Sequence, residues 1–104
     1  MLVFDTEIVR AGTIKHGEIY DTRIPVVNTG DTTVTPHAPQ SACSCTRGYF
    51  EPSDIPPGSV SFLALTFDSK KVGLGGFTKD VMITYNLSGV TKSKTIKLEI
   101  TVIK

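Results

Sequence analysis

Both cysteines of the 104-residue chain, Cys43 and Cys45, lie only two residues apart. In an extended chain, such side chains point to the same face, with their Cα atoms about 6.6 Å apart. This separation is near the upper limit for a disulfide, so a bridge there would be strained and easily reduced. The pair can carry out thiol–disulfide exchange or hold a soft metal ion with two thiolates. The alternative, which we expect, is a pair of reduced thiols packed at the edge of the core.

A zinc site requires two further ligands besides the two thiolates. His37 is the nearest histidine, but it precedes Cys43 by six residues, about 20 Å along an extended strand, and only a fold-back at Pro39 would bring it close. Nucleophilic catalysis requires a base beside the thiol, and no spacing selects His16 or His37 for that role. We therefore expect no bound metal, no cofactor and no enzymatic activity, and if a metal binds, its ligands are Cys43, Cys45 and His37.

A second group of residues is suited to binding a protein partner. Arg47, Tyr49 and Phe50 follow the cysteines in a segment that we expect to be a loop ending at Pro52. Arginine and aromatic side chains are common anchors of protein interfaces, although Phe50 is equally expected to plug the end of the core. We expect the partner also to contact Leu74, within the glycine-rich residues 73–76, and the N-terminal strand around Phe4, which is in addition its core anchor.

The elements that position these residues are predicted to be strands. No segment has a convincing helical period, apolar residues alternate, and Gly and Pro recur at intervals of about ten residues. Residues 11–18 read as a bend between glycines, and residues 28–31, 55–58 and 86–89 as turns. The predicted strands cover residues 2–9, 19–27, 32–40, 59–68, 77–85 and 91–104.

Two of these strands carry the strongest patterns. Residues 59–68 are apolar at both parities, which indicates a central strand or a bulge that switches the buried face. Residues 91–104 alternate clearly, with Ile96, Leu98, Ile100 and Val102 on one face. The predicted fold is all-β, an immunoglobulin-like antiparallel β-sandwich of about seven strands that forms one domain over residues 1–104.

Composition excludes several classes of partner. The net charge is +1 with both signs interspersed, so no basic face for nucleic acid is expected. No segment has the apolar length of a membrane span, and charged residues appear from Asp5 onward, so we expect a soluble protein without an export signal.

The order of several short motifs resembles a known family. These motifs are Gly12-Thr13-Ile14, Asn28-Thr29-Gly30-Asp31, Ser41-Ala42-Cys43-Ser44-Cys45-Thr46, Ile55-Pro56-Pro57-Gly58 and Gly76-Phe77. Together they resemble the bacterial immunoglobulin-like domain family of unknown function marked by a Cys-Gly-Cys-Thr motif, which is similar to the major-sperm-protein and abnormal-spindle-type sandwiches. Here Ser44 stands where that motif has glycine. The resemblance implies a binding or structural domain without catalytic residues.

The sequence thus predicts a non-enzymatic module that docks onto a larger assembly. The expected setting is a phage particle, with the chain as a capsid decoration or other accessory virion protein made in the host cytoplasm. Its partners would be capsid or other virion proteins, or copies of itself. The alternatives are a small thiol-redox or metal-binding protein using Cys43 and Cys45, and a cytoplasmic peptide-binding adaptor.

Overall fold

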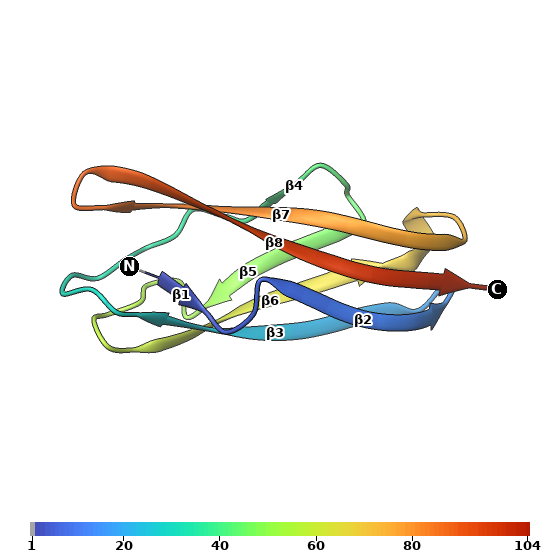
Figure 1. Cartoon of the computed structure of the whole chain (residues 1–104), viewed down its shortest axis with the longest axis horizontal. Coiled ribbons are helices and arrows are strands. Elements are labelled where there is room, and N and C mark those ends of the chain that lie inside the picture. The colour runs from blue at the N-terminus through green and yellow to red at the C-terminus, as the bar shows by residue number, and fades with distance from the viewer. Residues whose placement is uncertain (1) are drawn as a thin grey trace.

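The computed structural model describes residues 2–104 and consists of two packed β-sheets (Figure 1). Apart from one 3-10 turn at Ser69–Lys71, the regular structure of these residues is all strand, and none of their helical structure is long and apolar enough to cross a membrane. The strands are β1 (Leu2–Phe4), β2 (Ile8–Lys15), β3 (Ile19–Asn28), β4 (Gln40–Ser41), β5 (Thr46–Glu51), β6 (Val60–Asp68), β7 (Gly75–Leu87) and β8 (Val90–Ile103).

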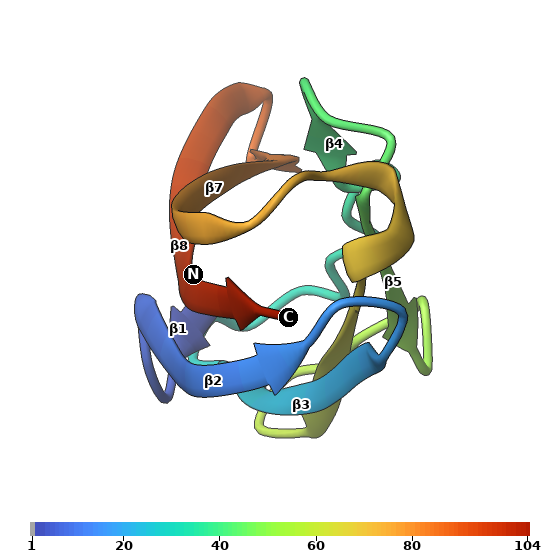
Figure 2. The same cartoon turned by 90° about the vertical axis from the view of Figure 1, so that its right-hand side faces the viewer.

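The two sheets have four strands each. Sheet A has the order β1-β3-β6-β5 and is antiparallel, whereas sheet B has the order β2-β8-β7-β4 and contains one parallel pair, β2 with β8. Viewed from the end, the edge strands β1 and β2 lie on one side of the sandwich and β4 and β5 on the other (Figure 2). The predicted all-β, immunoglobulin-like sandwich is therefore confirmed.

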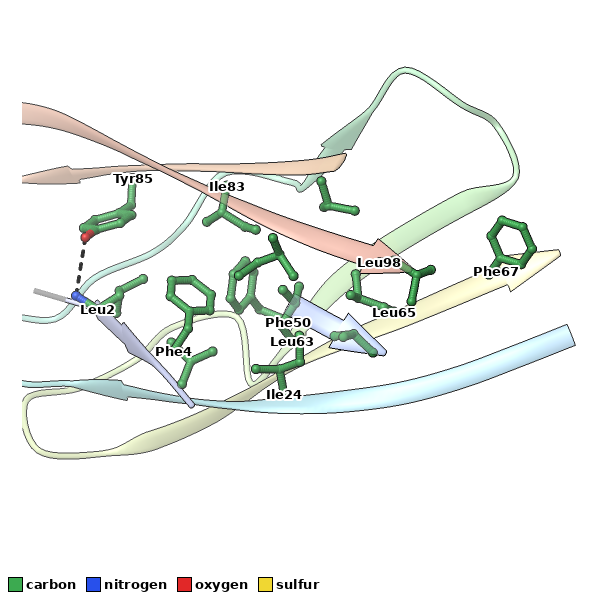
Figure 3. Close-up of a cluster of buried hydrophobic side chains, with 14 of the residues drawn as sticks. Leu2, Phe4, Ile24, Phe50, Leu63, Leu65, Phe67, Ile83, Tyr85 and Leu98 are labelled. Atoms are coloured by element: carbon green, nitrogen blue, oxygen red, sulfur yellow. Dashed lines mark hydrogen bonds between the residues drawn. The ribbon is translucent and has the colours of Figure 1, made fainter. Parts of the chain in front are cut away.

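The core lies between the inner faces of the two sheets. The strand alternation predicted for the C-terminal residues is confirmed, because Ile96, Leu98, Ile100 and Val102 are all buried. From sheet A, the rings of Phe4 and Phe50 meet edge to face with their centroids 6.5 Å apart (Figure 3). Each fully buried side chain of this size stabilises the fold by about 1.5–3 kcal/mol.

Strand β6 occupies the central position that its apolar residues predict. It pairs with β3 on one side and with β5 on the other. Leu63, Leu65 and Phe67 point into the core, while Phe62 and Ala64 lie on the outer face of sheet A. The strand has apolar residues at both its odd and its even positions, because each of its two faces belongs to a separate apolar surface.

The predicted turn at residues 28–31 is confirmed and is held by a buried amide. Asn28 is 0% exposed, and its Oδ1 accepts a hydrogen bond from the backbone N–H of Gly30 at 2.9 Å. Its Nδ2 donates to the carbonyls of Thr32 and Ile55, both at 2.8 Å. The amide thus ties the end of β3 to the segment that precedes β6.

Residues 32–40 do not form the predicted strand. Within them Val34 makes an isolated bridge with Ile55, and only the last residue, Gln40, belongs to a strand. Pro36 and Pro39 have no backbone N–H, so a continuous ladder is interrupted twice. Between them, the backbone N–H of His37 donates to the carbonyl of Thr84, which holds the segment against β7.

Two other segments are strands where a loop or bend was predicted. The expected loop after the cysteines is β5, which pairs with β6 along its whole length from Thr46 to Glu51. The expected bend at residues 11–18 is largely the second half of β2, which continues to Lys15. Gly12 adopts a φ of 76° where the register with β8 shifts, so this glycine accommodates a bulge rather than ending the strand.

Candidate functional site

The outer faces of the two sheets differ in chemistry. Sheet B presents charged and hydroxyl side chains, with ion pairs between Arg10 and Glu99 at 3.3 Å and between Lys97 and Asp80 at 3.1 Å. The outer face of sheet A also carries an ion pair, Arg23 with Glu51 at 3.1 Å, but beside it lies a contiguous apolar surface. We call this surface the sheet A face, and it consists of Val3, Pro25, Val27, Tyr49, Val60, Phe62 and Ala64.

Strand register places these apolar side chains side by side. Val3 pairs with Val27, and Val27 pairs with Val60, which makes one row across three strands. In the next row, Phe62 lies opposite Pro25. Val3, Val60 and Phe62 are 47%, 49% and 37% exposed, so the rows form an apolar patch open to solvent. Contiguous apolar patches of this kind mark protein-binding sites more often than isolated exposed residues do.

A depression of about 630 Å³ adjoins the patch. Its floor includes Ala64, whose short side chain lies in one cross-strand row between Arg23 and Tyr49. Arg23 Nη2 is held 3.1 Å from Glu51 Oε2, and the Tyr49 ring is 55% exposed. A partner's apolar or aromatic side chain can therefore sit on Ala64 between an aromatic ring and a guanidinium, the side chains most common in interface anchors.

The structure separates the predicted interface residues into two groups. Arg47 and Tyr49 are exposed on the same side of β5, and Leu74 is 56% exposed in the segment between the 3-10 turn and β7. Phe4 and Phe50 are 7% and 9% exposed and pack against each other. Their assignment as contact residues is wrong, because both occupy inward positions in their strands and their rings complete the core.

Sequence reasoning missed the part of the surface that β3 and β6 contribute, above all Phe62 and Val60. The signal was present, since residues 59–68 are apolar at both parities. Without the pairing of β6, that pattern could equally describe a strand buried on both faces. The pairing shows that the second face is open to solvent.

The cysteines form a disulfide, so the expectation of reduced thiols is wrong. Their Cα atoms lie 5.1 Å apart, because the chain turns here rather than extending: the N–H of Thr46 donates to the carbonyl of Cys43 at 3.2 Å. The expected position at the edge of the core is confirmed, with Cys45 1% exposed and Cys43 half-buried against the core cluster.

This disulfide contributes little to stability. It closes the shortest of loops, since the cysteines are two positions apart. The chain-entropy model gives about 1.6 kcal/mol for a loop of about three residues, compared with about 3 kcal/mol for a 15-residue loop. The stability that this disulfide adds therefore does not by itself account for the position of both cysteines at this turn.

The predicted metal ligands do not form a site among residues 2–104. The sulfur atoms of Cys43 and Cys45 are bonded to each other, and His37 is held beside Thr84 on β7. That described part of the chain has no group of three or more His, Cys, Asp and Glu side chains placed to hold a metal ion.

The fold is similar to several solved structures of low sequence identity. A protein of unknown function from Porphyromonas gingivalis W83 aligns with a TM-score of 0.82 and 18% identity, over 96% of this chain and 46% of that chain. The PapD-like domain 7 of human CEP192, described as an ASH / PapD-like domain, aligns with a TM-score of 0.80 and 13% identity, over 99% of this chain and 85% of that chain. The Vibrio cholerae VesB protease aligns with a TM-score of 0.67 and 11% identity, over 96% of this chain and 31% of that one. These likenesses show that the fold is an immunoglobulin-like sandwich, similar in structure to a PapD-like domain.

Comparison with curated protein sequences gives no match. The chain spans about half the length of the first structural relative, so the sandwich is one part of that longer protein. A family model covers nearly all of this chain, from residue 2 to residue 102. The protein belongs to the family described as "Protein of unknown function (DUF1573)".

Proposed function

We propose that this domain is a non-enzymatic protein-binding module that docks onto a larger assembly through the sheet A face. The observation that carries the proposal is the apolar row of Val3, Val27 and Val60 with Phe62 beside it, in which Val3, Val60 and Phe62 are exposed and Val27 is half-buried. Burying such a surface against a partner is favourable, by about 25 cal/mol for each Å² of apolar area removed from water.

The depression beside the row supports a specific rather than a general contact. Tyr49 and Arg23 flank a pocket with Ala64 at its floor, so one partner side chain can be held in a fixed position. Interfaces of this type draw most of their affinity from a few anchors in desolvated pockets. The charged outer face of sheet B is suited to remain in water, which gives the bound module a defined orientation.

The structural relatives support a role as a module within larger proteins. The matching sandwich makes up 46% of the Porphyromonas gingivalis chain, 31% of the Vibrio cholerae protease and 23% of a family 123 glycoside hydrolase from Clostridium perfringens. A fold that recurs beside unrelated catalytic chains is better suited to attachment than to one conserved chemistry.

The assembly in this proposal is a phage particle, on which the chain is an accessory protein such as a capsid decoration. A sandwich with an apolar area on one outer face and ion pairs on the other is suited to such an attachment. A peptide-binding adaptor of the host cytoplasm would use the same surface, so the identity of the partner separates the two settings.

The experiment is co-sedimentation of the native protein with particles from lysate of its source cells. We expect the protein to run with material in the megadalton range, and the double variant Tyr49→Ala/Phe62→Ala to lose at least tenfold in occupancy while staying folded. The matched control is Met82→Ala, an equally exposed apolar side chain on the outer face of sheet B, which should bind like wild type. Sedimentation as a free monomer would refute the assembly, and equal losses for both variants would refute the sheet A face.

A further inference from the structure

The two cysteines of the disulfide differ in exposure. Cys43 is half-buried and borders a surface hollow, while Cys45 is 1% exposed and belongs to the core. The Cys45 sulfur lies 3.4 Å from the hydroxyl oxygen of Thr46, which can donate a hydrogen bond to a thiolate at that position. A thiol from outside can therefore reach Cys43 and displace Cys45, but the reverse order of attack is blocked by burial.

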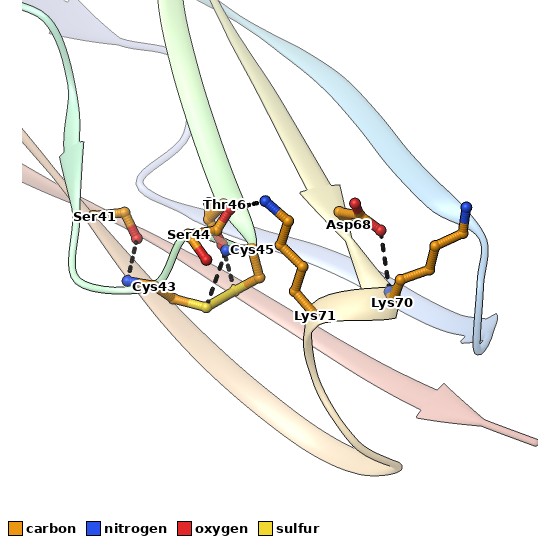
Figure 4. Close-up of a disulfide and its surroundings, with 8 residues drawn as sticks. All are labelled: Ser41, Cys43, Ser44, Cys45, Thr46, Asp68, Lys70 and Lys71. Atoms are coloured by element: carbon orange, nitrogen blue, oxygen red, sulfur yellow. Dashed lines mark hydrogen bonds between the residues drawn. A yellow bond between two sulfur atoms is a disulfide. The ribbon is translucent and has the colours of Figure 1, made fainter.

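Two cationic side chains lie near the cysteine that would leave, Cys45. A hollow beside Cys45 is lined by Arg47 and Lys71, with Asp68 as its one carboxylate. The Lys71 ammonium reaches back over the turn and donates to the carbonyl of Ser44 at 3.4 Å (Figure 4). Two cations against one anion favour the negative charge of a departing thiolate, which is the setting in which disulfides react readily.

An open strand edge runs past the accessible sulfur. Strand β4 pairs with β7 only at Val81 and Met82, and within residues 2–104 the rest of β7 from Gly75 to Asp80 pairs with β8 alone. Where β4 ends, the chain separates from β7 and leaves a hollow lined by Cys43 and residues 78–80. An extended peptide can add to such an edge through main-chain hydrogen bonds. A cysteine within that peptide would then face Cys43.

We propose that the Cys43–Cys45 disulfide is a thiol-exchange site for cysteines in extended peptide segments bound along the open edge of β7. The peptide thiolate attacks Cys43 Sγ, the bond between the two sulfurs breaks, and its electron pair leaves on Cys45 Sγ. A second peptide thiolate then attacks the peptide sulfur of the mixed disulfide and releases Cys43 as a thiolate. Two peptide thiols thus become one disulfide, two electrons and the two thiol protons pass to the cysteines, and the domain is itself the oxidant. The site lies on the β4–β5 side of the sandwich and does not depend on binding through the sheet A face.

The test uses the oxidised 104-residue chain and two probes. One is a blocked heptapeptide of Thr and Val with a single central cysteine, and the other is N-acetylcysteine methylamide, which presents the same thiol without a strand. Reactions are stopped with acid, and the adduct is counted and located by intact and peptide mass spectrometry. We expect the adduct on Cys43, formed at least tenfold faster by the heptapeptide than by the amide.

Four results would overturn the proposal or one of its parts. An adduct on Cys45 would rule out the exchange site. The site would also be ruled out if the heptapeptide thiol reacts with the domain no faster than it reacts with oxidised glutathione at the same concentration. Equal rates for the two probes would remove the role of the β7 edge. Lys71→Gln should slow the reaction at least threefold whereas Lys92→Gln, on the distant β7–β8 hairpin, should not, and equal rates for these variants would refute the electrostatic part. Because the wild-type adduct is located directly, the outcome does not rely on any cysteine variant being folded.

Discussion

Replacing Asn28 with alanine should destabilise the domain more than any surface change. The side chain is 0% exposed and makes three hydrogen bonds, two from Nδ2 to the carbonyls of Thr32 and Ile55 and one to Oδ1 from the N–H of Gly30. At about 1 kcal/mol for each bond, the loss is about 3 kcal/mol, and it rises towards about 5 kcal/mol where the abandoned groups stay buried. For a domain of this length, 3 kcal/mol lowers the melting temperature by about 15 °C.

The assay is urea unfolding followed by circular dichroism, with wild type and variant compared at a common slope. The matched control is Asn86→Ala, since Asn86 is exposed and accepts a single hydrogen bond, from the Thr91 hydroxyl at 3.0 Å. This control should change the free energy of unfolding by less than about 0.5 kcal/mol. If Asn28→Ala lies within 1 kcal/mol of wild type, or if the control costs as much, the reasoning from buried hydrogen bonds is refuted.

Three further changes test other parts of the fold. Gly48→Ala should lower the free energy of unfolding, measured in urea, by about 1–3 kcal/mol, because a Cβ at Gly48 would lie 2.9 Å from Leu65 Cδ2. Stability at or above that of wild type would show that β5 can move aside. Phe50→Ala should cost about 3–5 kcal/mol, since it removes the ring that packs against Phe4, and a loss below 1 kcal/mol would contradict its place in the core. Reducing the disulfide of the wild-type chain should lower the free energy of unfolding by about 1.6 kcal/mol, and unfolding on reduction would contradict the short-loop argument.

Elements governed by local periodicity could be predicted from the sequence. The alternation of Ile96, Leu98, Ile100 and Val102 determines which face of β8 is buried. The turn after β3 follows from residues 28–31, because asparagine caps its own backbone and glycine is conformationally free. In both cases the deciding contacts are formed within a few residues or repeat regularly along one strand.

Elements governed by pairing with distant strands could not be predicted. Strand β5 contains Gly48 and ends before a proline, which locally favours a loop, yet six consecutive pairs with β6 keep it extended. Residues 32–40 show the opposite case, since β-branched side chains favour a strand but Pro36 and Pro39 leave too few donors to pair. Propensity describes a residue on its own, whereas a strand also requires a partner.

The candidate surface was predicted in part for the same reason. Arg47 and Tyr49 could be identified by residue type alone, although the loop assigned to them is a strand. Phe62 and Val60 could not, because only the order of strands in sheet A shows which face of β6 remains open. The disulfide depends on a turn of a few residues, which brings the Cα atoms from the separation of an extended chain to 5.1 Å.

The parallel pairing of β2 with β8 has a mechanical consequence. The two strands are paired from Ile8–Lys97 to Lys15–Ile103, and they come from opposite ends of the chain. Tension applied outward at the two termini draws β2 backward and β8 forward, so the ladder is sheared along its length. The hydrogen bonds of a parallel ladder are evenly spaced and share such a force, instead of opening one after another as in a hairpin pulled from its open end. Load therefore passes first through the short pairing of β1 with β3 and then through the β2–β8 ladder, while β5 and β6 lie outside this path.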